Sequence, residues 1–291
     1  MKYPAVAWKT AVVTGASSGI GQATARLLKS RGWAVVGTSR SEAGVAALAA
    51  EGIAAVRMDL SDGTSVERAA ARMLELAEGR LGAVVDNAGY GQPGALMDVS
   101  REALRAQMET NVLGTVDLTN RLIPALRSAG AGRIVVLSSI VGRVVVPLLG
   151  AYAASKYALE AAGDAWRMEL ARFGISVSLV EPGPIATGFR RRCVSEAHGG
   201  GLEMEKTPYA ALYGKELSQP ERTYSRPTDV FRLGPEAVAE KIWHALTSRR
   251  PKARYPVTGA ARLGIVAKAL LPTRVADWVM ASKVIGRSLD A

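Results

Sequence analysis

The sequence predicts an α/β fold in which helices cover both faces of a parallel sheet. Short runs of β-branched and apolar residues alternate with longer Ala- and Leu-rich segments of helical pattern. The short runs are apolar throughout, which is typical of strands that are buried on both faces. Because strands joined by helices make right-handed crossovers, we expect a doubly wound sheet.

The expected elements follow one another in a regular order. The sequence predicts seven strands, at residues 11–14, 34–38, 54–58, 83–86, 133–138, 176–181 and 253–257. Helices are expected at residues 20–31, 42–50, 65–78, 101–126, 151–173, 208–217 and 235–248, and the long segment 101–126 is expected to contain a break. A seven-stranded parallel sheet accommodates this order.

The alternation of strands and helices changes after Pro182. Residues 183–235 contain several prolines and a His-Gly-Gly-Gly stretch, and an insertion of this length in a compact domain is usually functional. We therefore expect one domain over residues 1–258, with a substrate-binding loop at about 183–235. Residues 259–291 are expected to form a C-terminal helical extension, in which Pro272 divides the apolar and basic segment 260–285 into two short helices.

The composition indicates a globular protein with a basic surface. Apolar residues make up 48% and charged residues 22%, and 37 Lys and Arg against 26 Asp and Glu give a formal charge of +11. The basic residues are spread along the chain without a nucleic-acid-binding motif, which argues against nucleic acid as a partner. The single cysteine, Cys193, suits a reducing cytoplasm, and neither a secretory signal nor a membrane-spanning stretch is evident.

A glycine-rich turn follows the first expected strand and opens the first helix. It reads Thr14-Gly-Ala-Ser-Ser-Gly-Ile-Gly21, in which Gly15, Gly19 and Gly21 allow a tight turn and close approach to the backbone. The N-terminus of the helix would then face a phosphate group. A glycine-rich turn by itself can be only a turn, but this position between strand and helix predicts a dinucleotide site.

The end of the second expected strand indicates which dinucleotide is bound. An NAD site usually has a carboxylate there, which accepts hydrogen bonds from the adenosine ribose. This chain has Thr38-Ser39-Arg40 instead, and a hydroxyl with an arginine can bind a 2′-phosphate that a carboxylate would repel. We therefore expect NADP(H), although Arg40 could also be an ordinary basic residue in a loop.

Polar and small residues also end the third and fourth expected strands. Asp59 could accept a hydrogen bond from an adenine amino group, or it could cap a helix or form a turn with Ser61. Asn87-Ala88-Gly89 would let a cofactor lie close to the backbone, although small residues are also common in turns.

Tyr152 and Lys156 stand four residues apart in an expected helix, so their side chains share one face. A free tyrosine titrates near pH ~10, and a neighbouring ammonium group stabilises the phenolate. We therefore expect Lys156 to depress the pKa of Tyr152 and to make it an acid–base group.

In this order, the motifs resemble those of the short-chain dehydrogenase/reductase family over residues 9–188, with weaker agreement around 234–257. The resemblance implies a Rossmann fold and the catalytic residues Asn111, Ser139, Tyr152 and Lys156. Ser139 fits better than its neighbour because thirteen residues separate it from Tyr152. Within the family pattern Tyr152 exchanges a proton with the substrate oxygen and Ser139 holds the developing alkoxide. Lys156 also binds the nicotinamide ribose, and Asn111 fixes a water that links Lys156 to solvent.

The resemblance also implies the contacts to the cofactor. Pro182-Gly-Pro-Ile-Ala-Thr187 is similar to the segment that meets the nicotinamide carboxamide through Ile185 and Thr187. The expected cofactor-binding residues are Gly15, Ser17, Ser18, Gly19, Ile20, Gly21, Ser39, Arg40, Asp59, Leu60, Asn87, Ala88, Gly89, Tyr152, Lys156, Pro182, Gly183, Ile185 and Thr187.

A finer resemblance, to hydroxysteroid and retinol dehydrogenases and bacterial carbonyl reductases, implies a small hydrophobic carbonyl compound or alcohol as the substrate. The expected pocket walls are Val141, Leu148, Leu149 and Phe189, although such apolar residues are equally often core residues. Family members also lead us to expect a homodimer or homotetramer through the helices at 101–126 and 151–173.

Two alternatives remain open. The chain could be a catalytically idle NADP(H)-binding scaffold or redox sensor, but no expected catalytic position is substituted. The segment 260–285 could rest on an anionic membrane surface, although a lid or a subunit contact is favoured. His198 and His244 are too isolated for a metal site, so we expect no metal.

Overall fold

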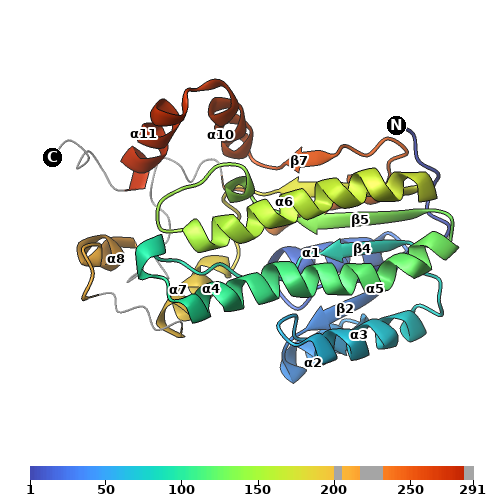
Figure 1. The fold of residues 1–291 in the computed structure, drawn as a ribbon. Coiled ribbons are helices and arrows are strands. Elements are labelled where there is room, and N and C mark those ends of the chain that lie inside the picture. Colours follow the sequence, from blue (N-terminus) through green and yellow to red (C-terminus); the bar gives the residue numbers. More distant parts are fainter. Residues whose placement is uncertain (200–204, 217–231, 285–291) are drawn as a thin grey trace.

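The computed structural model describes residues 1–199, 205–216 and 232–284, which form a layered α/β structure (Figure 1). Within these residues, seven parallel strands make one sheet in the order β3-β2-β1-β4-β5-β6-β7. The strands are β1 (Thr10–Val13), β2 (Ala34–Ser39), β3 (Ala54–Arg57), β4 (Ala83–Asp86), β5 (Gly132–Leu137), β6 (Ile175–Glu181) and β7 (Arg254–Pro256). The expected doubly wound sheet is confirmed.

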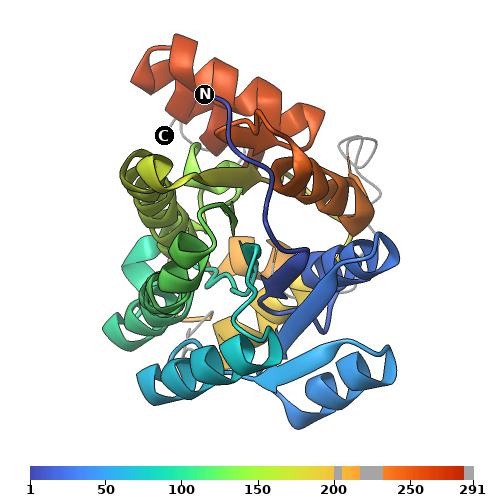
Figure 2. The ribbon, with the colours of Figure 1, turned by 90° about the vertical axis from the view of Figure 1, so that its right-hand side faces the viewer.

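Both faces of the sheet are buried because alternate strand residues enter opposite hydrophobic cores. In β1, Val12 belongs to one core and Val13 to the other. The first core is covered by α3 (Gly63–Leu76), α5 (Gly114–Ser128) and α6 (Gly150–Leu170). The second is covered by α1 (Gly19–Ser30), α2 (Glu42–Ala50) and α9 (Pro235–Thr247), and Figure 2 shows the two helical layers on either side of the sheet.

Two of the helices that cover the sheet begin at a residue whose side chain caps them. Ser41 accepts a hydrogen bond from the N–H of Gly44 at the start of α2, and Asp62 accepts one from Thr64 at the start of α3. At the start of α1, Ser18 forms no such cap. The first N–H groups of α1 are therefore left for another acceptor, and α1 is the helix that the glycine-rich turn precedes.

The expected break in the segment 101–126 is a π-helical turn. Helix α4 (Arg101–Met108) runs through the turn Glu109–Leu113 directly into α5. A π-helical turn inserts one residue more than an α-helical turn and often marks a functional site. Here it contains Asn111, whose side chain is completely buried.

The segment after β6 contains one more helix than the sequence predicts. Helix α8 (Ala210–Glu216) lies within the expected 208–217, whereas α7 (Phe189–Gly199) was not expected. Its arginines at 190–192 interrupt the apolar pattern by which an amphipathic helix is recognised. The remainder of the expected substrate loop, residues 200–204 and 217–231, lies outside the described residues.

The C-terminal extension forms two helices, as the position of Pro272 predicts. Helix α10 (Gly259–Leu270) follows β7, and α11 (Thr273–Val284) begins one residue after Pro272. Residues 285–291 of the expected extension lie outside the described part of the chain. No helix in the described ranges is both long enough and apolar enough to span a bilayer.

A pair of leucine substitutions tests this account of the core. Leu122 on α5 is completely buried, whereas Leu263 on α10 is 72% exposed. We expect Leu122→Ala to lower the free energy of unfolding by about 2–5 kcal/mol, because it removes core contacts and leaves a cavity. The change for Leu263→Ala should stay within about 0.5 kcal/mol. Urea denaturation measures both, and an equal loss for Leu263→Ala would contradict its exposure.

Candidate functional site

The glycine-rich turn between β1 and α1 is shaped for close approach to the backbone. Gly15 and Gly19 have φ angles of +63° and +55°, a left-handed conformation that favours glycine. A Cβ atom on Gly21 would collide with the carbonyl oxygen of Gly15, so only glycine fits there. The expected turn is present, and it leads to the uncapped start of α1.

Hydrogen bonds of Thr14 and Asn87 connect the ends of β1 and β4. The buried Thr14 hydroxyl accepts hydrogen bonds from the N–H groups of Asn87 and Ala88, at 2.9 and 2.8 Å. Asn87 Nδ2 donates in turn to the carbonyl oxygens of Thr14 and Gly15, at 2.8 and 3.3 Å. The segment after β4 therefore forms a fixed wall beside the glycine-rich turn.

Hydroxyl groups join the same turn to the end of β2. Ser17 Oγ donates to Ser39 Oγ at 3.1 Å, and the N–H of Gly15 donates to Thr38 Oγ1 at 3.1 Å. Ser39 is buried, and its neighbour Arg40 carries an exposed side chain. The Ser39 hydroxyl that the sequence predicts for a 2′-phosphate therefore contacts the glycine-rich turn, and Arg40 follows Ser39 directly in the chain.

The end of β3 adds a second arginine and an acid to this region. Arg57 is paired in register with Ser39 and donates from Nε to the carbonyl oxygen of Arg40 at 3.3 Å. Burial by itself would raise the pKa of Asp59, but hydrogen bonds from Ser61 and the charges of Arg40 and Arg57 lower it below its ordinary value. Ser61 donates to Asp59 Oδ1 from both N and Oγ, at 2.9 and 2.7 Å, so the turn foreseen for these residues is formed.

Tyr152 and Lys156 lie on the first turns of α6, and Ser139 lies in the turn after β5. The Lys156 ammonium group is 5.8 Å from the centre of the Tyr152 ring, and it donates to the carbonyl oxygen of Leu137 at 2.6 Å. The Ser139 side chain lowers the pKa of Tyr152, and its Oγ accepts a hydrogen bond from the N–H of Val141 at 3.3 Å. The structure thus brings three of the expected catalytic residues together.

The fourth expected catalytic residue, Asn111, is hydrogen-bonded to segments next to this cluster. Its Oδ1 accepts from the N–H of Tyr90 at 3.1 Å, and its Nδ2 donates to the carbonyl oxygen of Tyr90 at 2.9 Å and to Ser155 Oγ at 3.0 Å. Ser155 Oγ donates to the carbonyl oxygen of Tyr152 at 2.8 Å. Asn111 therefore links the π-helical turn to α6 and to the loop after β4, whereas its expected contact with a water stays a prediction.

The pKa values of the catalytic pair differ from the expectation. Burial raises the pKa of Tyr152, the neighbouring Cys193 thiol raises it further, and the hydrogen bond with Ser139 lowers it. Burial also lowers the pKa of Lys156 to about 8. The Tyr152 pKa is therefore raised and not depressed as expected, because burial outweighs the lowering by Ser139, and Lys156 is not among the causes of the shift.

Two buried acids that the sequence analysis did not single out lie near Lys156. Glu160, one turn farther along α6, and Asp86, at the end of β4, both raise the pKa of Lys156 against the effect of burial. The pKa of Asp86 is itself raised to about 7 by burial, against a hydrogen bond that Thr119 donates to Oδ2 at 2.9 Å and the charge of Lys156. Its position after an apolar strand and before Asn87 is a signal that could have identified Asp86.

The segment expected at the nicotinamide packs between the glycine-rich turn and the Ser139 turn. The Pro182 carbonyl oxygen accepts from the N–H of Ile140 at 2.9 Å, and a Cβ atom on Gly19 would lie 3.5 Å from the Thr187 side chain. Of the other expected cofactor residues, Gly183 packs against Thr258, Ile185 pairs with Leu233, Ile20 is partly buried and Leu60 is buried.

Helix α7, which the sequence did not predict, reaches the site in two places. Arg192 Nη2 donates to Ser18 Oγ at 3.1 Å, at the start of α1. Phe189 lies with its ring centre 5.5 Å from that of Tyr152, and the Cys193 thiol, Phe189 and Tyr152 all meet at Gly91. Arg192 and Cys193 were therefore missed as site residues, because the pattern gave no helix to place them.

The expected pocket walls separate into two groups. Val141 and Leu149 pack in the cluster that contains Tyr152, and Phe189 contacts the Tyr152 ring. Leu148 instead packs with Tyr213 of α8 and has a left-handed φ of +65°, so it faces a different cluster. The structure therefore places three of the four expected residues around Tyr152 and places Leu148 in a different cluster.

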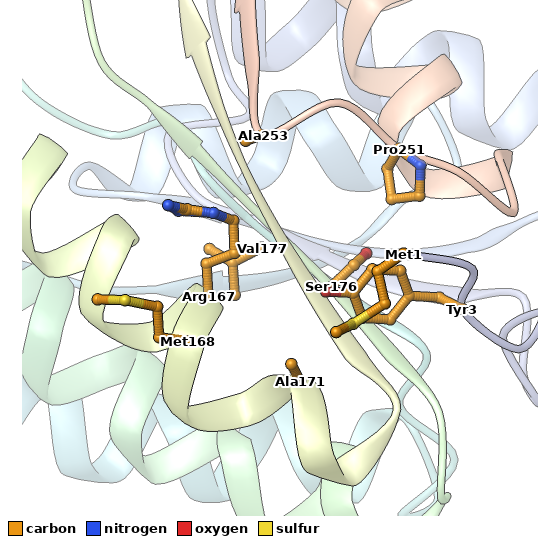
Figure 3. Close-up of a pocket in the computed structure, with 9 residues that line it drawn as sticks. All are labelled: Met1, Tyr3, Arg167, Met168, Ala171, Ser176, Val177, Pro251 and Ala253. Carbon is orange, nitrogen blue, oxygen red and sulfur yellow. The ribbon is translucent and has the colours of Figure 1, made fainter.

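The described part of the chain has hollows at different ends of the sheet. One of about 520 Å³ lies along α1 and the start of α9 and is bordered by Gly19 and Thr187. Another, of about 500 Å³, lies at the opposite ends of the strands and is lined by Met1, Tyr3, Met168 of α6 and Ser176 of β6, among others (Figure 3). It is remote from the catalytic cluster and has no part in the chemistry considered below. Across the ranges that the structure describes, no three His, Cys, Asp or Glu residues gather as metal ligands do.

Comparisons with known proteins agree with this geometry. The family model described as short chain dehydrogenase matches residues 9–197. An uncharacterised oxidoreductase of Escherichia coli strain K12 is 41% identical over 272 residues, which cover 94% of each chain. An NADPH-dependent 3-dehydrocapnine reductase of Ornithobacterium rhinotracheale is 33% identical and covers 92% of this chain and 95% of its own. A short-chain dehydrogenase from Streptomyces avermitilis has a TM-score of 0.75 at 28% identity, covering 98% of this chain and 99% of its own.

The buried carboxyl group of Asp86 makes a testable contribution to stability. Because its pKa is raised to about 7, the folded state holds a proton between about pH 4 and pH 7 that the unfolded state has released. This contribution is complete at low pH and is lost as the pH rises through 7. We expect Asp86→Asn, which keeps an acceptor for Thr119, to reduce the fall in unfolding free energy between pH 5 and pH 7.5, by up to about 1.4 kcal/mol per pH unit.

Urea denaturation at the two pH values measures this difference. Glu42→Gln is the matched control, because Glu42 is 74% exposed in its ion pair with Arg57. Parallel pH profiles for Asp86→Asn and the unsubstituted protein would show that Asp86 does not titrate in this range.

Proposed function

Because this chain belongs to the short-chain dehydrogenase family, we propose that it is an NADP(H)-dependent oxidoreductase that interconverts a hydrophobic ketone or aldehyde and its alcohol. The observation that carries the proposal is the buried cluster in which Ser139 acts on the Tyr152 side chain and the Lys156 ammonium group lies 5.8 Å from the centre of the Tyr152 ring. A proton donor, a second hydroxyl and a cation thus stand at one edge of the sheet.

The residues present fit a nicotinamide dinucleotide. The glycine-rich turn leaves no room for a Cβ atom at Gly21, and the start of α1 has no side-chain cap, as a pyrophosphate requires. Gly15, Ser17, Ser18 and Gly19 would hold the phosphates, and Ile185 and Thr187 would meet the nicotinamide. When bound, this cofactor supplies or accepts the hydride.

The chain itself handles the proton. The raised pKa of Tyr152 keeps its phenol protonated at neutral pH, which suits donation to a carbonyl oxygen in the direction of reduction. The Ser139 hydroxyl stabilises the charge that develops on the substrate oxygen. Lys156, with a pKa of about 8, can return a proton to Tyr152 near neutral pH.

The preference for NADP(H) rests on charge at the end of β2. Arg40 occupies the position where an acid would repel a 2′-phosphate, and Arg57 lies beside it with its Nε at 3.3 Å from the Arg40 carbonyl oxygen. Charge-assisted hydrogen bonds from guanidinium groups suit a phosphate. The relative from Ornithobacterium rhinotracheale is described as NADPH-dependent, which supports the same choice.

The substrate class rests on the surroundings of Tyr152. Val141, Leu149 and Phe189 present apolar side chains next to the phenol, and such walls favour a hydrophobic carbonyl compound. The same relative is named as a reductase of a 3-dehydro compound, which is a ketone. We also propose that the chain assembles as a homodimer or homotetramer, with α4, α5 and α6 as the contact.

Removal of the Tyr152 hydroxyl tests the catalytic role. We expect Tyr152→Phe to lower the turnover of hydrophobic ketones by about 10²–10⁴-fold, because the proton donor is lost, while NADPH still binds. The decrease of NADPH absorbance with a panel of ketones measures turnover, and fluorescence titration measures binding. Tyr157→Phe is the matched control, since Tyr157 is 40% exposed on the same helix. NADPH binding without turnover of any carbonyl compound by the unsubstituted protein would instead support an idle scaffold or sensor.

Replacement of Arg40 tests the choice of dinucleotide. We expect Arg40→Ala to weaken NADPH binding by about 10–100-fold and to leave NADH binding unchanged, because only NADPH carries the 2′-phosphate. Fluorescence titration with each dinucleotide measures the ratio. Arg72→Ala serves as the control, because Arg72 is exposed on α3 and pairs with Glu75. Equal losses for both dinucleotides, or none, would refute the role of Arg40.

A further inference from the structure

The two C-terminal helices carry apolar side chains that the rest of the described chain leaves uncovered. On α10, Leu263, Val266 and Leu270 are 72%, 52% and 79% exposed, and their spacing places them on one face. On α11, Val275 and Trp278 are 44% and 61% exposed. Contiguous exposed apolar faces on a folded protein usually mark a surface that binds something.

Basic residues border both faces. Arg262 directly precedes Leu263, and Arg274 directly precedes Val275; both arginines are exposed. Lys268 and Asp277 form an ion pair at 3.6 Å that joins the two helices to each other. The segment 259–284 contains four Lys or Arg against the single acid Asp277. A partner for this surface is therefore apolar and anionic.

A second copy of the chain fits this surface poorly. A symmetric contact would bring the same surface of two copies together, so Arg262 and Arg274 of both copies would lie in one interface, where like charges oppose the contact. The anionic headgroups and apolar acyl chains of a membrane match both features at once. Trp278 has the amphipathic indole that such boundaries favour.

The two helices also lie next to the turn after β5 that contains Ser139 and Ile140, which we call the catalytic turn. A Cβ atom on Gly264 of α10 would lie 3.2 Å from Ile140 Cδ1, and Ile140 directly follows Ser139. Thr258, which caps α10, packs against Gly183 of the segment expected at the nicotinamide. Figure 1 shows α10 and α11 at the same end of the molecule as α7 and α8.

We propose that α10 and α11 dock this protein on an anionic lipid bilayer. The exposed side chains of Leu263, Val266, Leu270, Val275 and Trp278 enter the boundary between headgroups and acyl chains, and Arg262 and Arg274 contact the lipid phosphates. A consequence that rests on the proposed function is that the catalytic turn then lies close to the membrane, where a hydrophobic carbonyl compound concentrates.

Sedimentation of the full chain with lipid vesicles tests the docking without any measurement of activity. We expect the protein to sediment with vesicles of mixed phosphatidylcholine and phosphatidylglycerol, less with pure phosphatidylcholine, and less again at high salt. The double variant Leu263→Glu/Trp278→Glu should bind the mixed vesicles at least about tenfold more weakly. Arg262→Gln/Arg274→Gln should lose the preference for phosphatidylglycerol.

Met168→Glu is the matched control, because Met168 is 71% exposed on α6 at the opposite end of the molecule. It should sediment as the unsubstituted protein does, and unfolding curves and NADPH titration establish that each variant is folded. The proposal is overturned if the protein stays in the supernatant with every vesicle, or if Met168→Glu weakens binding as much as Leu263→Glu/Trp278→Glu does. It is equally overturned if the only effect of Leu263→Glu/Trp278→Glu is to change a dimer into a monomer in analytical ultracentrifugation. Vesicle binding that persists in a protein without ketone turnover would refute the proposed function and leave the docking intact.

Discussion

The buried amide of Asn111 is the contact on which the geometry of the site depends. It joins the π-helical turn, the loop after β4 and α6 through hydrogen bonds to Tyr90 and Ser155 of 2.9–3.1 Å. A buried amide that loses its partners costs free energy, so the three segments are held in one arrangement. Ser155 also donates to the Tyr152 carbonyl oxygen, so a short chain of hydrogen bonds connects this amide to the backbone of Tyr152. The π-helical turn positions the Asn111 side chain so that it contacts both the loop after β4 and α6.

The sequence predicts the fold well because the strands are apolar on both faces and the helices between them are separated by clear turns. It also predicts the glycine-rich turn and a break within residues 101–126, which the structure places at Glu109–Leu113, since glycine and interrupted periodicity are local signals. Helix α7 was missed because two of its apolar residues, Phe189 and Cys193, lie next to Tyr152 and not in the core of the sheet, and arginines lie between them. A helix that packs on a site instead of on a sheet lacks the pattern by which helices are recognised.

The electrostatics of the site show a different limit of sequence analysis. The spacing of Tyr152 and Lys156 correctly predicts that they share a helix face, but a spacing contains no information on burial. Burial raises the pKa of the phenol and lowers that of the ammonium group, so both neutral forms are favoured. Asp86 and Glu160 offset part of this effect from other segments, and only the folded chain brings them to Lys156.

Helix α10 approaches the catalytic turn closely at Gly264, which has no side chain and lies against Ile140. A Cβ atom at position 264 would lie 3.2 Å from Ile140 Cδ1, so the end of the Ile140 side chain would have to shift slightly, and Ile140 follows Ser139 directly. The sizes of the residues at positions 140 and 264 are therefore coupled. Across related sequences this would appear as covariation, with a smaller residue at one position accompanying a larger one at the other. A tail transplanted from a relative would need its own catalytic turn to accompany it.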